Sequence, residues 1–165
     1  MADPLAEIPC PTPEHTARLA TALAPQLGPG DTLLLKGDIG AGKTHFARAL
    51  IQSRLAAAGL FEDVPSPTFT LVQTYWDGAV EIWHADLYRL GAAPDVAELG
   101  LDAAFETAIC LVEWPDLLGA LAPPDALTIA FSQTGDTQRT LHLIGHDRWR
   151  PVIEPAQTKA SVQRV

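Results

Sequence analysis

Apolar runs alternate with helical patterns along the chain, and this alternation predicts an α/β fold. Residues 31–36 form a short strand-like run with Leu33, Leu34 and Leu35 at its centre. Residues 43–58 then repeat apolar side chains at helical spacing, and Gly59 marks the end of that helix. Residues 108–112 are continuously apolar and lead into Glu113, as expected for a buried parallel strand.

Capping and turn residues predict the elements around these three. Thr12 and Pro13 are typical of the N-cap and first position of a helix, which Pro25 should kink or end. Asp77-Gly78 separates two strand-like runs and indicates a β-hairpin inserted into the α/β pattern. The expected elements besides the first helix are the hairpin strands over residues 66–76 and 79–85, short helices over 94–100 and 102–107, and a final strand pair over 126–131 and 139–144.

The two ends of the chain carry weaker patterns. The first ten residues show no strong signal, and from about residue 150 the pattern fades. A chain of 165 residues is the length of one domain with a substantial core. We therefore expect a single domain over residues 1–150 and a frayed tail over 151–165.

Composition is that of a water-soluble globular protein, with 47% hydrophobic and 19% charged residues. No apolar run approaches the roughly 18 residues of a membrane span, and the N-terminus lacks a signal-peptide pattern. Cys10 and Cys110 have no partner at metal-site or redox spacing. These features predict a cytoplasmic protein without a membrane partner, a disulfide framework or a zinc site.

The charge distribution argues against a nucleic-acid-binding face. The net charge is −9, and residues 90–138 contain eight carboxylates but no Lys, Arg or His. A protein that itself grips a phosphate backbone is expected to spread cations more widely.

Residues 37–44 carry the chemistry that organises the rest of the chain. They read Gly-Asp-Ile-Gly-Ala-Gly-Lys-Thr, which fits G-x-x-x-x-G-K-[ST] between an expected strand and an expected helix. The glycines allow the backbone N–H groups to form a concave anion site at the helix N-terminus. Lys43 adds a charge for the β- and γ-phosphates, and the Thr44 hydroxyl is suited to ligate Mg²⁺. The motif predicts a nucleotide site, so the fold expected is a P-loop NTPase-like three-layer fold with a mixed sheet.

Mg²⁺ at such a loop needs a second protein partner, usually an acid at the end of a buried strand. Glu113 fits that position and is the first candidate catalytic and metal-binding residue, acting on the metal through water or partly as a base. Trp114 beside it can shield the site or pack in the core, and the sequence does not separate the two.

Asp86 is the second candidate catalytic residue, at an expected strand end among His84, Tyr88 and Arg89. It can position metal-bound water, or it can form a structural ion pair with Arg89. Ser66-Pro67-Thr68 is either a switch-like loop that meets the γ-phosphate or a plain turn into a strand.

Four segments in order resemble the TsaE family (older name YjeE), bacterial P-loop ATPases of tRNA threonylcarbamoyladenosine synthesis. They are the glycine loop, then Ser-Pro-Thr-Phe-Thr, His-Ala-Asp-Leu-Tyr-Arg-Leu and Leu-Val-Glu-Trp-Pro, and the resemblance covers roughly residues 8–144. The last two segments are far more specific than the glycine loop. The resemblance implies Mg-ATP as cofactor, docking on the TsaB–TsaD heterodimer, and ATP hydrolysis that resets that complex. Contact with tRNA would be indirect, through the complex.

The resemblance also implies the site residues. Thr44 and Glu113 would serve Mg²⁺, and Thr12 matches a nucleotide-contacting position. The family often has a second Thr where this chain has His45, so the backbone amide would remain while a hydroxyl contact to phosphate would be missing. The loop residues that would hold the nucleotide are Gly40, Ala41, Gly42, Lys43, Thr44 and His45.

Two other functions compete with an accessory ATPase. A small-molecule kinase would need lid arginines, and none follows Arg89 up to residue 138. A nucleotide-gated binding module without hydrolysis would tolerate neutralisation of Glu113.

Overall fold

The computed structural model describes residues 4–68, 70–90 and 93–162 of the chain. Seven strands form one mixed sheet in the order β1-β7-β6-β2-β5-β4-β3. Neighbours among β6, β2, β5 and β4 are parallel, whereas β1 with β7, β7 with β6 and β3 with β4 are antiparallel. The strands are β1 Ala6–Cys10, β2 Thr32–Lys36, β3 Val72–Trp76, β4 Glu81–Asp86, β5 Ile109–Glu113, β6 Leu127–Gln133 and β7 Arg139–Ile144.

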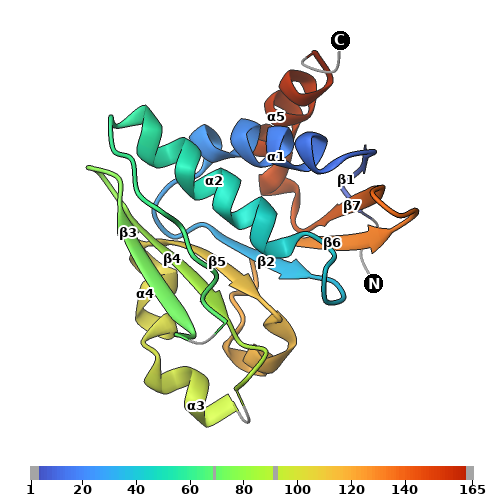
Figure 1. The fold of residues 1–165 in the computed structure, drawn as a ribbon. Coiled ribbons are helices and arrows are strands. Elements are labelled where there is room, and N and C mark those ends of the chain that lie inside the picture. The colour runs from blue at the N-terminus through green and yellow to red at the C-terminus, as the bar shows by residue number, and fades with distance from the viewer. Residues whose placement is uncertain (1–3, 69, 91–92, 163–165) are drawn as a thin grey trace.

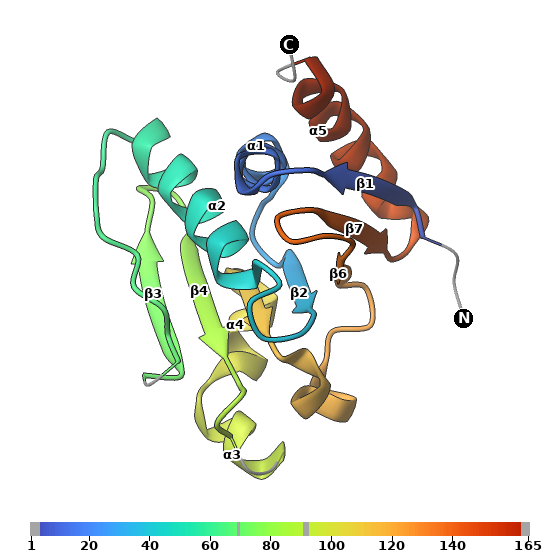
Figure 2. The ribbon, with the colours of Figure 1, turned by 45° about the vertical axis from the view of Figure 1, so that its right-hand side comes forward.

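Helices cover both faces of this sheet and give three layers (Figure 1). Figure 2 shows the separation from a second direction, with α1, α2 and α5 on one face and α3 and α4 on the other. Short 3₁₀ turns cover residues Ala24–Gln26, Pro115–Leu121 and Asp147–Trp149. The helices are α1 Pro13–Leu23, α2 Lys43–Ala57, α3 Ala93–Glu98, α4 Leu101–Thr107 and α5 Arg150–Val162.

The central strands are apolar on both faces because both faces are covered. Leu33 and Leu35 of β2 pack in the core beneath α1 and α2, whereas Leu34 belongs to a second cluster with Leu101 and Val112. Side chains alternate across a strand, so this division follows from the consecutive leucines. The α/β fold class predicted from the sequence is confirmed, including the mixed sheet.

Parallel strands place their carboxyl ends at one edge of the sheet, and ligands bind at that edge in open α/β folds. Asp86 at the end of β4 lies opposite Glu113 at the end of β5, and Leu35 of β2 lies opposite Glu113 on its other side. The glycine loop leaves β2 at the same edge (Figure 1). Three segments far apart in sequence therefore meet there.

The predicted hairpin is confirmed, although its first strand is shorter than expected. Strand β3 begins at Val72, and Phe69 within the expected strand lies outside the described residues. Asp77 Oδ1 accepts hydrogen bonds from the N–H groups of Ala79 at 2.9 Å and Val80 at 2.8 Å. These bonds, with Gly78 at a φ of +93°, close the turn.

The two chain ends differ from the prediction. Strand β1 was not expected; it pairs with β7 and buries Ile8 and Cys10. The expected frayed tail is wrong for Arg150–Val162, which form helix α5, while residues 163–165 lie outside the described part of the chain. Ile153 and Ala156 are buried in the core cluster that includes α1, so tertiary packing outweighs the proline at position 155 inside the helix.

Within the described ranges, no helix is both long and apolar enough to cross a membrane.

Candidate functional site

The glycine loop, residues 37–44, joins β2 to α2 and lines a cavity of about 380 Å³. Gly42 is the N-cap of α2 with a φ of +108°, a left-handed conformation that favours glycine. A Cβ on Gly37 would lie 3.1 Å from the Cβ atoms of Ala41 and Phe131. The fixed glycines of the motif are therefore required by the backbone turn and by close packing against β6.

Arg139 of β7 braces the loop from outside the cavity. Its Nε donates to the Ala41 carbonyl at 3.1 Å, and its Nη2 donates to the Gly40 carbonyl at 3.2 Å. These bonds satisfy outward-facing carbonyl groups, which favours inward-facing N–H groups in the same turn. Arg139 is not among the residues predicted from the sequence, because a contact across 98 residues leaves no local pattern.

Lys43 is buried at the base of the cavity, with 5% of its surface exposed. Its ammonium donates to the Gly37 carbonyl and, at 3.1 Å, to the Asp38 carbonyl. Burial lowers the pKa of Lys43, while the negative charges of Glu113, Asp86 and Asp38 oppose that shift. The Lys43 ammonium is thus held by backbone carbonyl groups, which the oxygens of a bound phosphate can replace.

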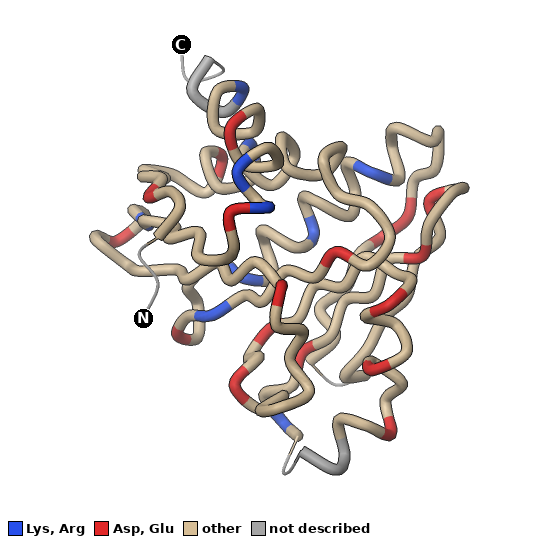
Figure 3. The backbone as a smooth tube through the Cα atoms, turned by 180° about the vertical axis from the view of Figure 1, so that it is seen from behind, with Lys and Arg blue, Asp and Glu red and all other residues tan. Residues whose placement is uncertain are grey.

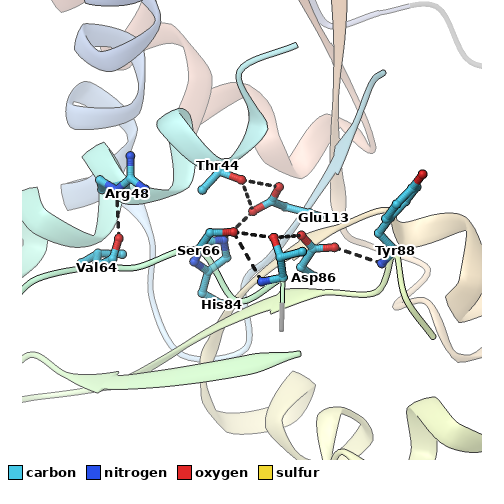
Figure 4. A network of polar contacts seen from close by, with 9 residues as sticks. Thr44, Arg48, Val64, Ser66, His84, Asp86, Tyr88 and Glu113 are labelled. Carbon is cyan, nitrogen blue, oxygen red and sulfur yellow. Dashed lines mark hydrogen bonds and ion pairs between the residues drawn. The ribbon is translucent and has the colours of Figure 1, made fainter. Parts of the chain in front are cut away.

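Thr44 and Glu113 meet directly across the cavity (Figure 4). The Thr44 hydroxyl lies 2.8 Å from Glu113 Oε1 and 3.0 Å from Oε2. His84 Nε2 lies 2.7 Å from the same Oε2, and His84 is completely buried. From the sequence, His84 was predicted only as a neighbour of Asp86, although the i, i+2 spacing on one strand places both side chains on the same face.

Asp86 forms a second polar group on the neighbouring strand (Figure 4). Its Oδ1 accepts from the Tyr88 N–H at 3.0 Å, and its Oδ2 accepts from the Thr68 hydroxyl at 3.3 Å. The Ser66 and Thr68 hydroxyls lie 2.6 Å apart. The loop over residues 66–68 therefore reaches the cavity through Thr68, and it contacts Asp86 there.

Trp114 both lines the cavity and packs in the second core cluster. The centre of its ring lies 3.7 Å from the Lys43 ammonium and 4.7 Å from the Tyr88 ring. Its φ of +58° is uncommon for a large residue and turns the chain sharply after Glu113. The two sequence-based interpretations of Trp114 are thus compatible.

Most of the predicted site residues line the cavity, and Thr12 is outside that set. Thr12 caps α1, where its hydroxyl lies 2.7 Å from His15 Nδ1. His45 contacts Pro13, the residue after Thr12, and its Nε2 lies 2.9 Å from the Pro13 carbonyl oxygen. The predicted residues that line the cavity are Gly40, Ala41, Gly42, Lys43, Thr44, His45, Asp86 and Glu113.

The arrangement fits a polyphosphate with a magnesium ion. In the part of the chain that the structure describes, no group of three or more His, Cys, Asp or Glu side chains is placed to hold a metal. Mg²⁺ suits such a site, because it is usually held by one or two protein ligands together with substrate phosphates and water. Thr44 and Glu113 are the residues that would hold it, and Lys43 would meet the phosphates.

Comparisons with known proteins identify the family of the chain. Residues 10–141 match the family model of the threonylcarbamoyl adenosine biosynthesis protein TsaE. The chain is 34% identical to a tRNA threonylcarbamoyladenosine biosynthesis protein TsaE of Rickettsia felis, over 92% of this chain and 90% of that protein. It is 38% identical to the Bacillus subtilis protein of the same name, over 78% of each.

The fold is also similar to a crystal structure of Bacillus subtilis YdiB, with a TM-score of 0.76 and 31% identity. That similarity covers 96% of this chain and 97% of the YdiB chain. With the family match over most of its length, the chain belongs to the TsaE family.

Proposed function

We propose that the protein binds Mg-ATP at the glycine loop and hydrolyses it. The contact of Thr44 with Glu113 beside Lys43 carries this proposal, because it joins the three side-chain types that a magnesium-nucleotide site requires. Mg²⁺ would neutralise charge on the β- and γ-phosphates. Lys43 would orient the γ-phosphate, and Glu113 would hold Thr44 and the metal in place.

Asp86 and Thr68 are proposed to orient water at the far side of the γ-phosphate. Both line the cavity, and Asp86 is only 4% exposed. A buried carboxylate with a hydroxyl partner can accept a proton from water or hold it by a hydrogen bond. We therefore assign Glu113 to the metal and Asp86 to water.

We further propose that hydrolysis supports tRNA N6-threonylcarbamoyladenosine synthesis through the TsaB–TsaD complex. Membership of the TsaE family supports the pathway. The charge distribution supports action through a protein partner, because the chain carries no cation between residues 90 and 138. Figure 3 shows the Asp and Glu residues spread over the molecule, among fewer Lys and Arg residues, whereas direct tRNA binding would need a surface rich in cations.

The test is ATP hydrolysis by the protein alone, with TsaB–TsaD, and with TsaB–TsaD and tRNA. We expect stimulation by TsaB–TsaD that is lost in Lys43→Ala and in Glu113→Gln. Lys159→Ala, which changes an exposed lysine of α5, should behave as wild type. Phosphoryl transfer to a small acceptor would support the kinase instead. Full function of Glu113→Gln would support a binding module without hydrolysis.

A further inference from the structure

His84 is a fully buried polar side chain placed beneath the proposed metal site. It lies on β4 opposite Leu111 of β5, two residues before Asp86. Its face of the sheet is the one covered by α2, so the ring lies between the core and Glu113. Figure 4 shows His84 and Thr44 approaching the Glu113 carboxylate from different sides.

The contact with Glu113 fixes where the ring carries a proton. A carboxylate oxygen only accepts, and Nε2 lies 2.7 Å from Glu113 Oε2, so Nε2 bears hydrogen and donates. Nδ1 is buried and has no hydrogen-bond partner among the described residues. The bond to Glu113 is therefore the polar contact that explains an imidazole at this position.

Core packing alone does not explain the histidine. The apolar side chains of Ile82 and Leu111 surround this part of the sheet, and both are fully buried. A leucine or phenylalanine at position 84 would pack there without leaving a buried nitrogen unpaired. The residue type thus serves the carboxylate rather than the core.

We propose that His84 is a positioning residue for the magnesium-nucleotide site, and this inference rests on the proposed function. Its Nε2–H holds Oε2 of Glu113 from the core side, which leaves Oε1 directed at the Thr44 hydroxyl 2.8 Å away. The carboxylate is therefore oriented before the nucleotide arrives. Partners that orient a metal-site carboxylate in this way typically change metal affinity when they are replaced.

The experiment compares ATP affinity in Mg²⁺ with ATP affinity in EDTA, using isothermal titration with a non-hydrolysable ATP analogue. The dissociation constant in EDTA divided by the dissociation constant in Mg²⁺ measures how strongly the metal increases the affinity for the nucleotide. His84→Phe keeps a ring and removes the donor, so we expect this ratio to fall about 10–100-fold while affinity in EDTA stays that of wild type. A glutamine amide can reach the Nε2 position, so His84→Gln should restore most of the ratio.

Two further variants separate positioning from stability. In a Glu113→Gln background, His84→Phe should leave the ratio unchanged, because the two residues act as a unit. If His84→Phe does not fold, His84→Asn replaces it, since its shorter amide does not reach Glu113. Thermal unfolding of every variant shows which ones are folded.

The outcomes distinguish this inference from the function beneath it. A wild-type protein without magnesium-dependent ATP binding would overturn both. A folded His84→Phe or His84→Asn with the wild-type ratio would overturn the role of His84 and leave the proposed function intact. Equal loss in His84→Gln and His84→Phe would also contradict it, because the restored donor would then have no effect.

Discussion

Arg54 and Asp77 form a largely buried ion pair that joins two of the elements on which the site is built. Arg54 lies near the end of α2, whose first residues are Lys43 and Thr44. Asp77 precedes β4, which ends at Asp86. The guanidinium contacts Asp77 Oδ2 through Nε at 2.9 Å and Nη2 at 2.8 Å. Its Nη1 also donates to the carbonyls of residues 24 and 27 at 2.6 Å and 3.1 Å.

The perturbation that isolates this pair is Asp77→Asn. The amide oxygen can still accept the N–H groups of Ala79 and Val80, so the turn is preserved while the charge is removed. Removing one partner of a buried ion pair costs about 3–5 kcal/mol, and here Arg54 is 15% exposed and keeps two carbonyl acceptors. We therefore expect a loss of about 3 kcal/mol, the lower end of that range, which corresponds to a melting temperature lower by about 6–12 °C.

The pH dependence of the unfolding free energy provides a second, independent test of this ion pair. Burial by itself would raise the pKa of Asp77, but the N–H groups of Val80 and Ala79 and the Arg54 guanidinium outweigh it and hold that pKa below its ordinary value of 3.8. The unfolded chain therefore takes up the proton first as the pH falls. The stabilisation is complete above 3.8 and is lost as the pH falls through the lower folded pKa.

Urea unfolding followed by circular dichroism, at pH 7 and below the ordinary pKa of 3.8, measures both effects. The difference in unfolding free energy between wild type and Asp77→Asn should be constant near neutrality and shrink in acid. Asp147→Asn is the matched control, since Asp147 pairs with Arg150 at 3.0 Å but is 86% exposed, and it should cost less than about 1 kcal/mol. An Asp77→Asn effect as small as the control, or one that does not shrink in acid, would refute the reasoning.

Three further predictions follow from packing and burial. Gly37→Ala should lower the free energy of unfolding, measured in urea, by about 1–3 kcal/mol, because the added Cβ would lie too close to Ala41 and Phe131. Gly28 has open space around it, so the control Gly28→Ala should change the free energy of unfolding by less than about 0.5 kcal/mol. Trp149→Ala should cost about 3–5 kcal/mol in the same assay, since the ring is fully buried and its N–H donates to the carbonyl of residue 125 at 2.7 Å. A smaller loss would mean that the 3₁₀ turn before α5 contributes little to the core. Burial raises the pKa of Cys110 to about 12. Iodoacetamide at pH 8 should therefore label this thiol only after denaturation, which mass spectrometry would detect. Labelling of Cys110 in the native protein would contradict its burial.

The elements that the sequence predicted well are those specified by local patterns. The consecutive leucines 33–35, the N-cap at Thr12 and the Asp77-Gly78 turn each determine structure within a few residues. Strand β1 and helix α5 depend instead on distant partners. The register of β1 against β7 makes a strand of Ala6–Cys10, and burial against α1 stabilises a helix that contains a proline at position 155. Such tertiary contacts are absent from any short window of the sequence.

The same distinction applies within the site. The glycine-loop motif and the strand-end positions of Asp86 and Glu113 identified both carboxylates, but not how they divide the work. The proposed division depends on the order of strands, which places β5 between β2 and β4 and so puts Glu113 within reach of a hydroxyl 69 residues away and an imidazole 29 residues away. Asp86, one strand farther from β2, instead contacts Thr68 on the loop before β3. Because β5 adjoins the strand that carries the glycine loop, the strand order supports the proposal that Glu113 shares a metal with Thr44. The contact of Asp86 with Thr68 likewise supports the proposal that Asp86 acts on water beside the loop over residues 66–68.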